Sequence, residues 1–188
     1  MEFRVMSRHM AEQYVSQKHD EKYAVISISI SNVRGDRAFL QKIAVPDCGM
    51  IACLNLAFDD VYIGESYGVA MTDVQAQAII AFVESKLDKV DFFIVHCEAG
   101  RSRSAGVAAA LSKWINGEDW DYFLNPKYTP NSYCYQTILE WAFPEKPITK
   151  EDKEEILHKI TVNQNLDCDW DVVYDKFGVP IEVKEIYQ

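Results

Sequence analysis

Residues 92–104 read FFIVHCEAGRSRS and carry the clearest structural pattern in the sequence. The four apolar residues at the start of this stretch predict a short buried strand, because a brief apolar run bounded by polar residues is typical of a strand covered on both faces. Gly100 then favours a tight turn, and the alanine-rich segment 105–114 predicts a buried helix that ends at Gly117. A strand that passes through a short turn directly into a helix indicates an α/β layer structure.

The chain before this stretch alternates strand-like and helix-like segments. Strands are predicted at 23–30 and 50–58 from their apolar and β-branched content. An edge strand is predicted at 3–6, before a short helix near 11–16. Together with the 92–104 stretch, these segments predict an α/β fold with a central, mostly parallel sheet flanked by helices.

Two capping patterns predict further helices. Thr72 and Gln75 form a capping box, in which each side chain can bond to a free backbone N–H of the first turn. Asn131 is the predicted N-cap of a helix that Pro144 stops. The helix after the capping box is expected to use one apolar face, formed by Val74, Ala78, Ile79, Phe82, Val83 and Leu87.

The last part of the chain differs in composition from the rest. Residues 1–144 carry the α/β pattern, whereas residues 145–188 hold eleven acidic and six basic residues. Within this acidic extension, a helix is predicted from 149 to about 160, and a hairpin from segments 170–174 and 179–186. We expect the extension to pack on the main domain.

Composition and charge exclude several classes of protein. The 188 residues are 48% apolar and 26% charged, as in an ordinary globular domain. The net charge of −10 argues against nucleic acid or an anionic membrane as partner, because the long-range field repels polyanions. The sequence contains no apolar run long enough for a membrane span or a secretory signal, so we expect a cytoplasmic protein, with a monomer favoured.

The cysteines and acidic clusters do not predict a metal site. The five cysteines are scattered, without the paired spacing of zinc ligands or of a disulfide framework, which fits reduced thiols in a cytosolic protein. The acidic segment 167–171 lacks the glycine and the terminal glutamate of an EF-hand loop.

Cys97 stands out among the cysteines because of its place in the predicted fold. It lies where a buried strand turns into a helix, so backbone N–H groups and the positive end of the helix surround it. Such surroundings favour the thiolate, which is the nucleophilic form. Arg103 brings a planar guanidinium that can bind two phosphoryl oxygens at once, and the Ser104 hydroxyl would lie near the sulfur.

The segment HCEAGRSRS at 96–104 resembles the H-C-x-x-G-x-x-R-S signature of the cysteine-based protein-tyrosine phosphatase superfamily, in particular its compact dual-specificity-like branch. The resemblance covers roughly residues 23–143. It implies hydrolysis of a phosphomonoester through a phosphocysteine on Cys97, without metal or cofactor. It also implies that Ser104 eases the departure of sulfur and that His96 shapes the loop. The implied phosphate-binding loop consists of Glu98, Ala99, Gly100, Arg101, Ser102 and Arg103.

The resemblance also implies a general acid on a separate loop upstream. The apolar residues that end in Asp59 and Asp60 resemble the family's strand and acidic loop, and their alternation places the acid on Asp60. Asp59 stays open as the alternative, because a shift of one residue cannot be settled from the sequence. Asp60 lies 37 residues before Cys97, somewhat farther than in small members of the family.

The implied substrates are a phosphorylated protein or a small phosphomonoester. Protein phosphotyrosine and dual-specificity activity are both compatible with the motif, and Glu98 argues against inositol polyphosphates. Two other functions stay open: a catalytically silent module that binds phosphopeptides, and sulfur transfer of the rhodanese type, which the Arg103-Ser104 ending fits less well. Aromatic residues after the motif are expected in the core and at the rim, namely Trp120, Tyr122, Phe123, Tyr128, Tyr133, Tyr135, Trp141 and Phe143.

Overall fold

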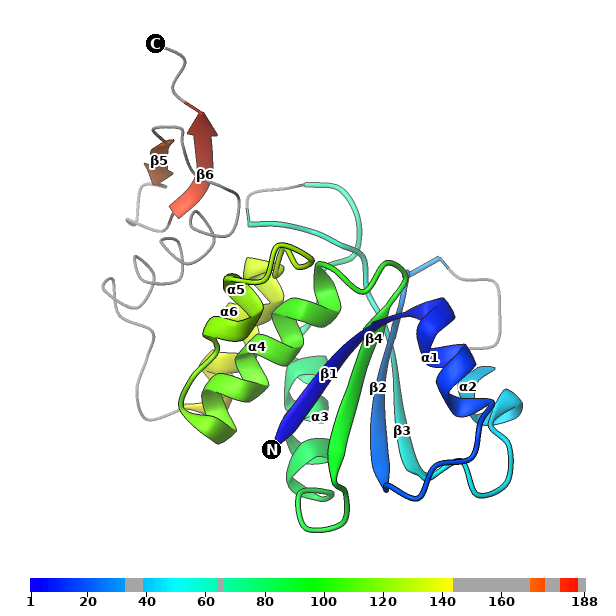
Figure 1. Cartoon of the computed structure of the whole chain (residues 1–188). Helices are drawn as coiled ribbons and strands as arrows, with labels where there is room; N and C mark the ends of the chain where they lie inside the picture. The colour runs from blue at the N-terminus through cyan, green and yellow to red at the C-terminus, as the bar shows by residue number, and fades with distance from the viewer. Residues whose placement is uncertain (33–38, 64–65, 144–169, 175–179, 186–188) are drawn as a thin grey trace.

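The protein is described by a computed structural model over residues 1–32, 39–63, 66–143, 170–174 and 180–185. In these residues four parallel strands form a sheet in the order β1-β4-β2-β3 (Figure 1). The strands are β1 (Glu2–Ser7), β2 (Tyr23–Ser29), β3 (Met50–Ala57) and β4 (Phe92–Cys97). The helices are α1 (Arg8–Val15), α2 (Phe39–Ile43), α3 (Asp73–Glu84), α4 (Arg103–Asn116), α5 (Trp120–Phe123) and α6 (Ser132–Ala142).

Helices cover both faces of the sheet, as Figure 1 shows: α1 and α2 lie on one face, and α3, α4 and α6 on the other. Alternate residues of β4 belong to the cores on the two faces of the sheet, because successive side chains of a strand point to opposite faces. Phe93 and Val95 join the larger core with α3, α4 and α6. Phe92 and Ile94 join the smaller core under α1. The continuous apolar run of β4 therefore reflects a central strand with two covered faces.

The predicted α/β class is confirmed, and the sheet is parallel throughout. β2 and β3 each end one residue before the predicted end, and β1 is an edge strand as predicted. The helix predicted near 11–16 begins earlier, at Arg8, because the Ser7 hydroxyl accepts a hydrogen bond from Met10 N and caps it. The short helices α2 and α5 were not predicted.

The capping box of α3 is present, but the predicted apolar face of the helix is wrong at two positions: Val74, and Leu87, which lies beyond the end of α3 at Glu84. Thr72 accepts from Gln75 N, and the Gln75 side chain accepts from Thr72 N. Val74 is 74% exposed, and Ala76 is buried in its place beside Ile79 and Val83. Position 74 lies in the first turn, where the helix turns this side chain toward solvent.

The later elements agree with the sequence pattern where they are described. Asn131 caps α6 by accepting from Cys134 N, and Gly117 ends α4 in the left-handed conformation. In the extension, β5 (Trp170–Tyr174) and β6 (Pro180–Glu185) pair antiparallel, as predicted for the hairpin. The helix predicted from 149 to about 160 lies outside the described residues. None of the described helices has the length and apolar character needed to cross a membrane.

Candidate active site

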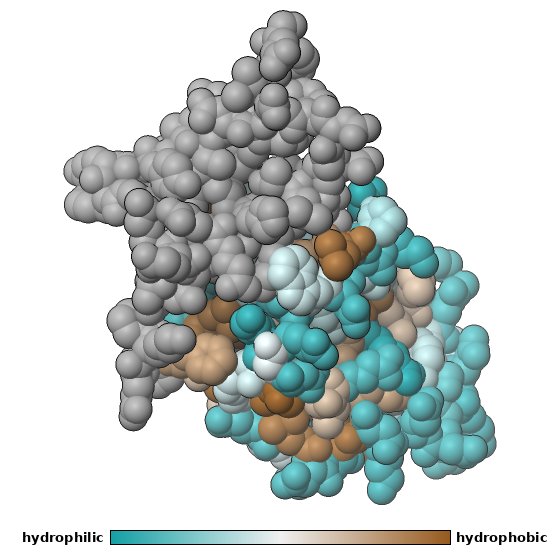
Figure 2. All heavy atoms as spheres, turned by 60° about the vertical axis from the view of Figure 1, so that its left-hand side comes forward, coloured by the Kyte–Doolittle hydropathy of each residue, from teal (hydrophilic) through white to brown (hydrophobic). Residues whose placement is uncertain are grey.

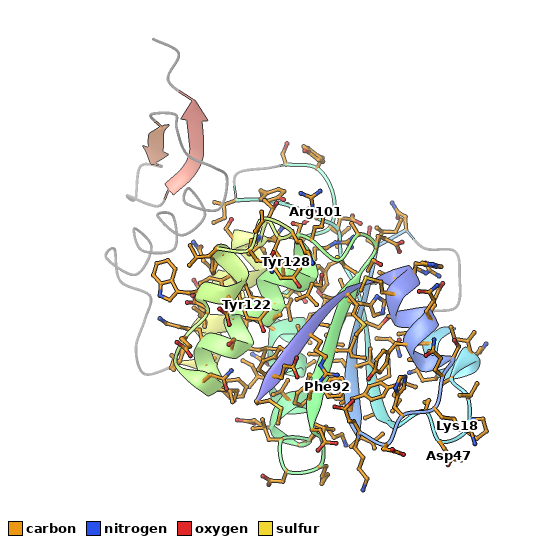
Figure 3. The ribbon with its side chains drawn as sticks, viewed as in Figure 1. Lys18, Asp47, Phe92, Arg101, Tyr122 and Tyr128 are labelled. Carbon is orange, nitrogen blue, oxygen red and sulfur yellow. The ribbon has the colours of Figure 1, made fainter. Side chains whose placement is uncertain are left out.

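The candidate residues gather where β2, β3 and β4 end. Because these strands are parallel, their carboxyl ends share one edge of the sheet. Cys97 is the last residue of β4, and Asp59 and Asp60 follow β3. Figure 3 shows Arg101 at this end of the molecule, whereas the exposed ion pair of Lys18 and Asp47 lies at the opposite end. The edge of the sheet thus brings the predicted thiol, guanidinium and carboxylates into one region.

The Cys97 side chain is buried beside a hydroxyl. Cys97 is 2% exposed, and its Sγ lies 3.1 Å from Oγ of Ser104, which is fully buried on the first turn of α4. The Ser104 hydroxyl can donate to the sulfur, and a donor in this position stabilises negative charge on it. This is the contact that the sequence analysis anticipated for these two residues.

The backbone of the 97–104 loop turns its carbonyl groups outward. Three of its carbonyl oxygens accept hydrogen bonds from N–H groups outside the loop: Glu98 O from Arg8 N (3.1 Å), Arg101 O from Thr129 N (2.9 Å) and Ser102 O from Asn131 N (3.1 Å). Over the described part of the chain, no acceptor is found for the N–H groups of residues 98–103. A ring of unpaired N–H groups at the start of a helix is a ready anion site.

Gly100 is required by the fold of this loop. Its φ is +68°, a conformation that other residues adopt with strain. A Cβ at this position would lie 2.4 Å from the backbone nitrogen of Ser7 and 2.5 Å from the carbonyl carbon of Met6. The 97–104 loop therefore rests directly on the junction between β1 and α1.

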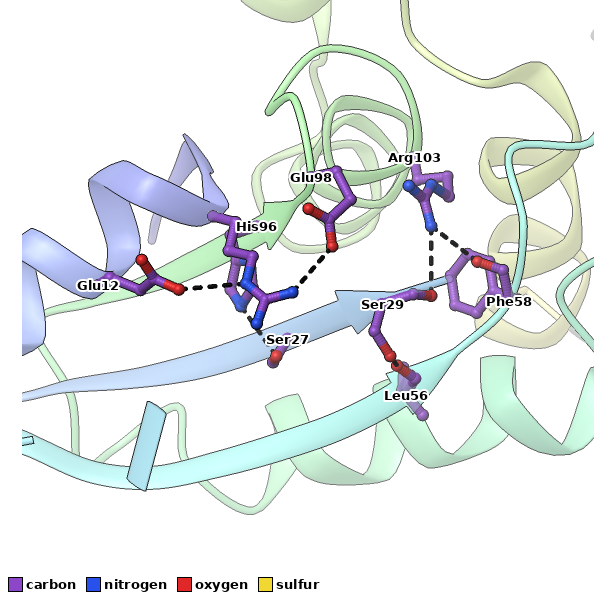
Figure 4. A network of polar contacts seen from close by, with 9 residues as sticks. Glu12, Ser27, Ser29, Leu56, Phe58, His96, Glu98 and Arg103 are labelled. Carbon is purple, nitrogen blue, oxygen red and sulfur yellow. Dashed lines mark hydrogen bonds and ion pairs between the residues drawn. The ribbon is translucent and has the colours of Figure 1, made fainter. Parts of the chain in front are cut away.

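The Arg103 guanidinium is buried, and only some of its N–H donors have hydrogen-bond partners among the described residues. Arg103 is 5% exposed, and its Nη1 donates to the carbonyl oxygens of Phe58 (2.8 Å) and Ser29 (3.2 Å), as Figure 4 shows. Its Nε is buried and has no partner among the described residues. A buried donor without a partner is costly and calls for an explanation, and an anion bound in the 97–104 loop would supply one.

Asp60 lies against the 97–104 loop. Its Oδ1 accepts hydrogen bonds from Ser102 Oγ at 2.7 Å and from Asn131 Nδ2 at 2.9 Å. The carboxylate is exposed, so it can reach a molecule that enters from solvent. These contacts bring the end of β3 and the first turn of α4 together.

Asp59 is engaged elsewhere. Its carboxylate accepts from the Ser31 hydroxyl (2.6 Å), from Ser31 N (2.8 Å) and from Val69 N (2.8 Å). The Ser31 hydroxyl, followed by the two backbone N–H groups, lowers the pKa of this carboxyl. Asp59 therefore braces the turn after β3, whereas Asp60 contacts the 97–104 loop.

His96 lies on β4 directly before the 97–104 loop and is buried in the sheet. It is 2% exposed, and its Nε2 lies 2.8 Å from the hydroxyl of Ser27 on the neighbouring strand (Figure 4). Burial lowers the pKa of His96 to about 4, although a backbone contact with Cys97 opposes this shift. The imidazole is consequently neutral at pH 7 and ties β4 to β2.

Three further residues contact the site and were not singled out for this in the sequence analysis. Arg8 pairs with Glu98 at 3.3 Å. The Tyr62 hydroxyl lies 3.0 Å from Ser102 Oγ, and Asn131 was predicted only as a helix cap. Their contacts join positions that are far apart in the sequence, and no local pattern reveals them.

The aromatic residues after the motif divide between core and surface, as predicted. Phe123 and Tyr135 are buried, whereas Trp120, Trp141 and Phe143 are about 40% exposed. The molecular face drawn in Figure 2 carries hydrophobic residues among hydrophilic ones. In Figure 3, Tyr128 lies between Arg101 and Tyr122. Within the described ranges, no three histidine, cysteine or acidic side chains form a metal-binding group.

Comparison with known proteins gives a distant structural likeness. No protein-family model and no curated protein matches the sequence. Among solved structures, the chain is similar to one described as the crystal structure of Tk-PTP in the active form. The two align over 87% of this chain and 91% of the other, with 14% identity and a TM-score of 0.39. At these values the likeness carries no argument for function, so any proposal has to rest on the site.

Proposed function

We propose that the protein hydrolyses phosphomonoesters through a phosphocysteine on Cys97, without a metal or cofactor, and that its substrates are phosphotyrosine proteins, with or without phosphoserine and phosphothreonine. One observation carries this proposal. A buried thiol, 3.1 Å from the Ser104 hydroxyl, lies at the start of a loop whose N–H groups and Arg103 Nε lack partners among the described residues. This arrangement supplies a nucleophile and an anion site together.

In the first step, the Cys97 thiolate attacks the phosphorus atom. The S–P bond forms as the bond between phosphorus and the leaving oxygen breaks, and Asp60 gives its proton to that oxygen. Arg103 and the N–H groups of residues 98–103 hold the remaining phosphoryl oxygens, where negative charge is greatest. Contacts of Asp60 with Ser102 support Asp60 rather than Asp59 as the acid.

In the second step, water replaces the sulfur. Asp60, now ionised, accepts a proton from the water as its oxygen bonds to phosphorus and the S–P bond breaks. The sulfur leaves as a thiolate, and the Ser104 hydroxyl donates to it. Free phosphate departs and the thiolate is restored, so the cycle needs no external oxidant or reductant.

The direct test is Cys97→Ser assayed on p-nitrophenyl phosphate in the presence of a chelator. We expect turnover to fall by more than about 10⁴-fold, as for other nucleophile replacements, while the wild-type rate is unaffected by the chelator. The matched control is Cys53→Ser, because burial raises the pKa of the Cys53 thiol to about 12 and keeps it protonated. Retained turnover in Cys97→Ser overturns the proposal.

Assays of substrate class separate this proposal from the two other functions. Phosphate release from phosphotyrosine, phosphoserine and phosphothreonine peptides of one sequence distinguishes tyrosine from dual specificity. Peptide binding without release would indicate a silent binding module. Activity with thiosulfate, in the absence of phosphate release, would indicate sulfur transfer.

A further inference from the structure

The Asn131 side chain joins three parts of the site. Asn131 is fully buried. Its Nδ2 donates to Asp60 Oδ1 at 2.9 Å and to the Val61 carbonyl oxygen at 3.0 Å, and its Oδ1 accepts from Cys134 N at 2.9 Å. Both amide hydrogens and the amide oxygen are therefore engaged, which fixes the orientation of the side chain.

The backbone of Asn131 is held as firmly as its side chain. Its N–H donates to Ser102 O at 3.1 Å. Helix α4 approaches closely at Gly106, where a Cβ would lie 2.4 Å from the Asn131 carbonyl oxygen. Asn131 is thus a fixed point between the 97–104 loop and the residues after β3.

The two oxygens of Asp60 are unequal as a result. Oδ1 accepts from both Asn131 Nδ2 and Ser102 Oγ. Across the described residues, Oδ2 has no hydrogen-bond partner. Because a carboxyl oxygen that already accepts two hydrogen bonds is a poor place for a proton, a proton on Asp60 belongs on Oδ2.

We infer that Asn131 is a positioning residue for the general acid: by holding Oδ1, it keeps Oδ2 as the oxygen that carries the proton to the leaving group. This inference rests on the proposed function. Ser102 alone would hold Asp60 less firmly, because its hydroxyl is also engaged by Tyr62 at 3.0 Å and belongs to a partly exposed side chain. Asn131 acts only through Asp60 and need not touch the substrate.

The test is Asn131→Ser. Serine is a good N-cap, so α6 keeps its cap, but the shorter side chain cannot reach Asp60. Phenyl phosphate has a poor leaving group that needs a proton, whereas an aryl phosphate with a strongly acidic phenol needs little help. We expect kcat/KM to fall by about 10-fold for phenyl phosphate, and by much less for the activated ester.

Two controls separate positioning from stability. Thr137→Ala removes a hydroxyl of the same helix, which donates to the Tyr133 carbonyl oxygen at 2.8 Å. This change should leave the ratio of the kcat/KM values for the two substrates unchanged. In a chain that already carries Asp60→Asn, Asn131→Ser should cause no further loss, because the acid that Asn131 positions is gone. If Asn131→Ser lacks a cooperative melting transition, Asn131→Thr replaces it, since threonine also caps the helix but cannot reach Asp60.

The outcomes distinguish this inference from the proposed function. Wild-type protein without phosphatase activity overturns both. Wild-type activity that depends on Cys97 and Asp60 supports the proposed function. With that activity present, an equal loss on both substrates, or an additive loss with Asp60→Asn, overturns the role of Asn131 alone.

Discussion

The 97–104 loop and the 59–63 segment lie at the same edge of the sheet but are built in different ways. The first has its signal in its own sequence, namely a strand end, a glycine with φ of +68° and the first turn of α4, although N–H groups of distant residues hold its carbonyl groups. The second is organised by distant partners, with Asp59 held by Ser31 and Asp60 by Asn131. The nucleophile can therefore be found from a local stretch of sequence, whereas the position of the acid depends on contacts of the assembled fold.

After loss of the nucleophile itself, Arg103→Lys should have the largest effect, and it tests the 97–104 loop. A lysine cannot bond to the Phe58 carbonyl oxygen and offer a second fixed donor to a phosphoryl group. We expect kcat/KM for p-nitrophenyl phosphate to fall by about 10³-fold. A loss smaller than 10-fold, with melting unchanged, would show that the guanidinium fork is not needed.

His96 should make stability depend on pH. In the folded protein, burial lowers the pKa of His96 to about 4, below the ordinary histidine value of 6.5. The unfolded chain therefore binds a proton more readily between these pH values, so stability falls as pH drops from about 6.5 to about 4. The expected change is about 3 kcal/mol, measured from urea unfolding at several pH values. His96→Gln should lose this part of the dependence of the free energy of unfolding on pH. If the variant keeps the same dependence, other titrating groups cause it.

Asp60→Asn and Asp59→Asn test the 59–63 segment as a pair. Removing the acid should lower kcat/KM for phenyl phosphate by about 10²-fold. Asp59→Asn should chiefly lower the melting temperature, because Asp59 accepts from Ser31 and Val69 rather than facing the 97–104 loop. If Asp59→Asn causes the larger loss of kcat/KM, Asp59 rather than Asp60 is the general acid.

Ser104→Ala should have a smaller effect than the changes at Arg103 and Asp60 and act mainly on the second step. Losing a hydrogen bond to the departing thiolate costs about 1.5–3 kcal/mol, so the second step should slow by at least about 10-fold. Rapid-mixing assays should then show a burst of phenol before a slow steady state. Equal slowing of the burst and the steady state would contradict this role.

The positions of the strands and the 97–104 loop follow from features that the sequence displays, whereas the order of the strands in the sheet was not predicted. β4 and the loop have local signals, because an apolar run, Gly100 and the spacing of Cys97 and Arg103 lie within a few residues. Helix ends with side-chain caps, such as Thr72, were also predictable. The prediction that Val74 lies on the apolar face of α3 was wrong, because an apolar residue in the first turn can point to solvent when the next turns supply the buried face.

The choice between Asp59 and Asp60 could not be made from the sequence. It depends on where β3 leaves the sheet: Phe58 N still bonds to Ser29 O, but Asp59 N bonds to Val69 O. These bonds join segments far apart in the chain, and no spacing rule predicts them. The same holds for Asn131, whose capping role is visible in the sequence while its bond to Asp60 is not.

The phosphocysteine is tested most directly by detecting a phosphoryl group on Cys97. Protein that is turning over an aryl phosphate is denatured rapidly, digested and analysed by mass spectrometry. We expect a phosphoryl group on the peptide that contains Cys97, in larger amount in Asp60→Asn because the second step lacks its base, and none in Cys97→Ser. Full turnover with no adduct on Cys97, together with activity in Cys97→Ser, would contradict the account.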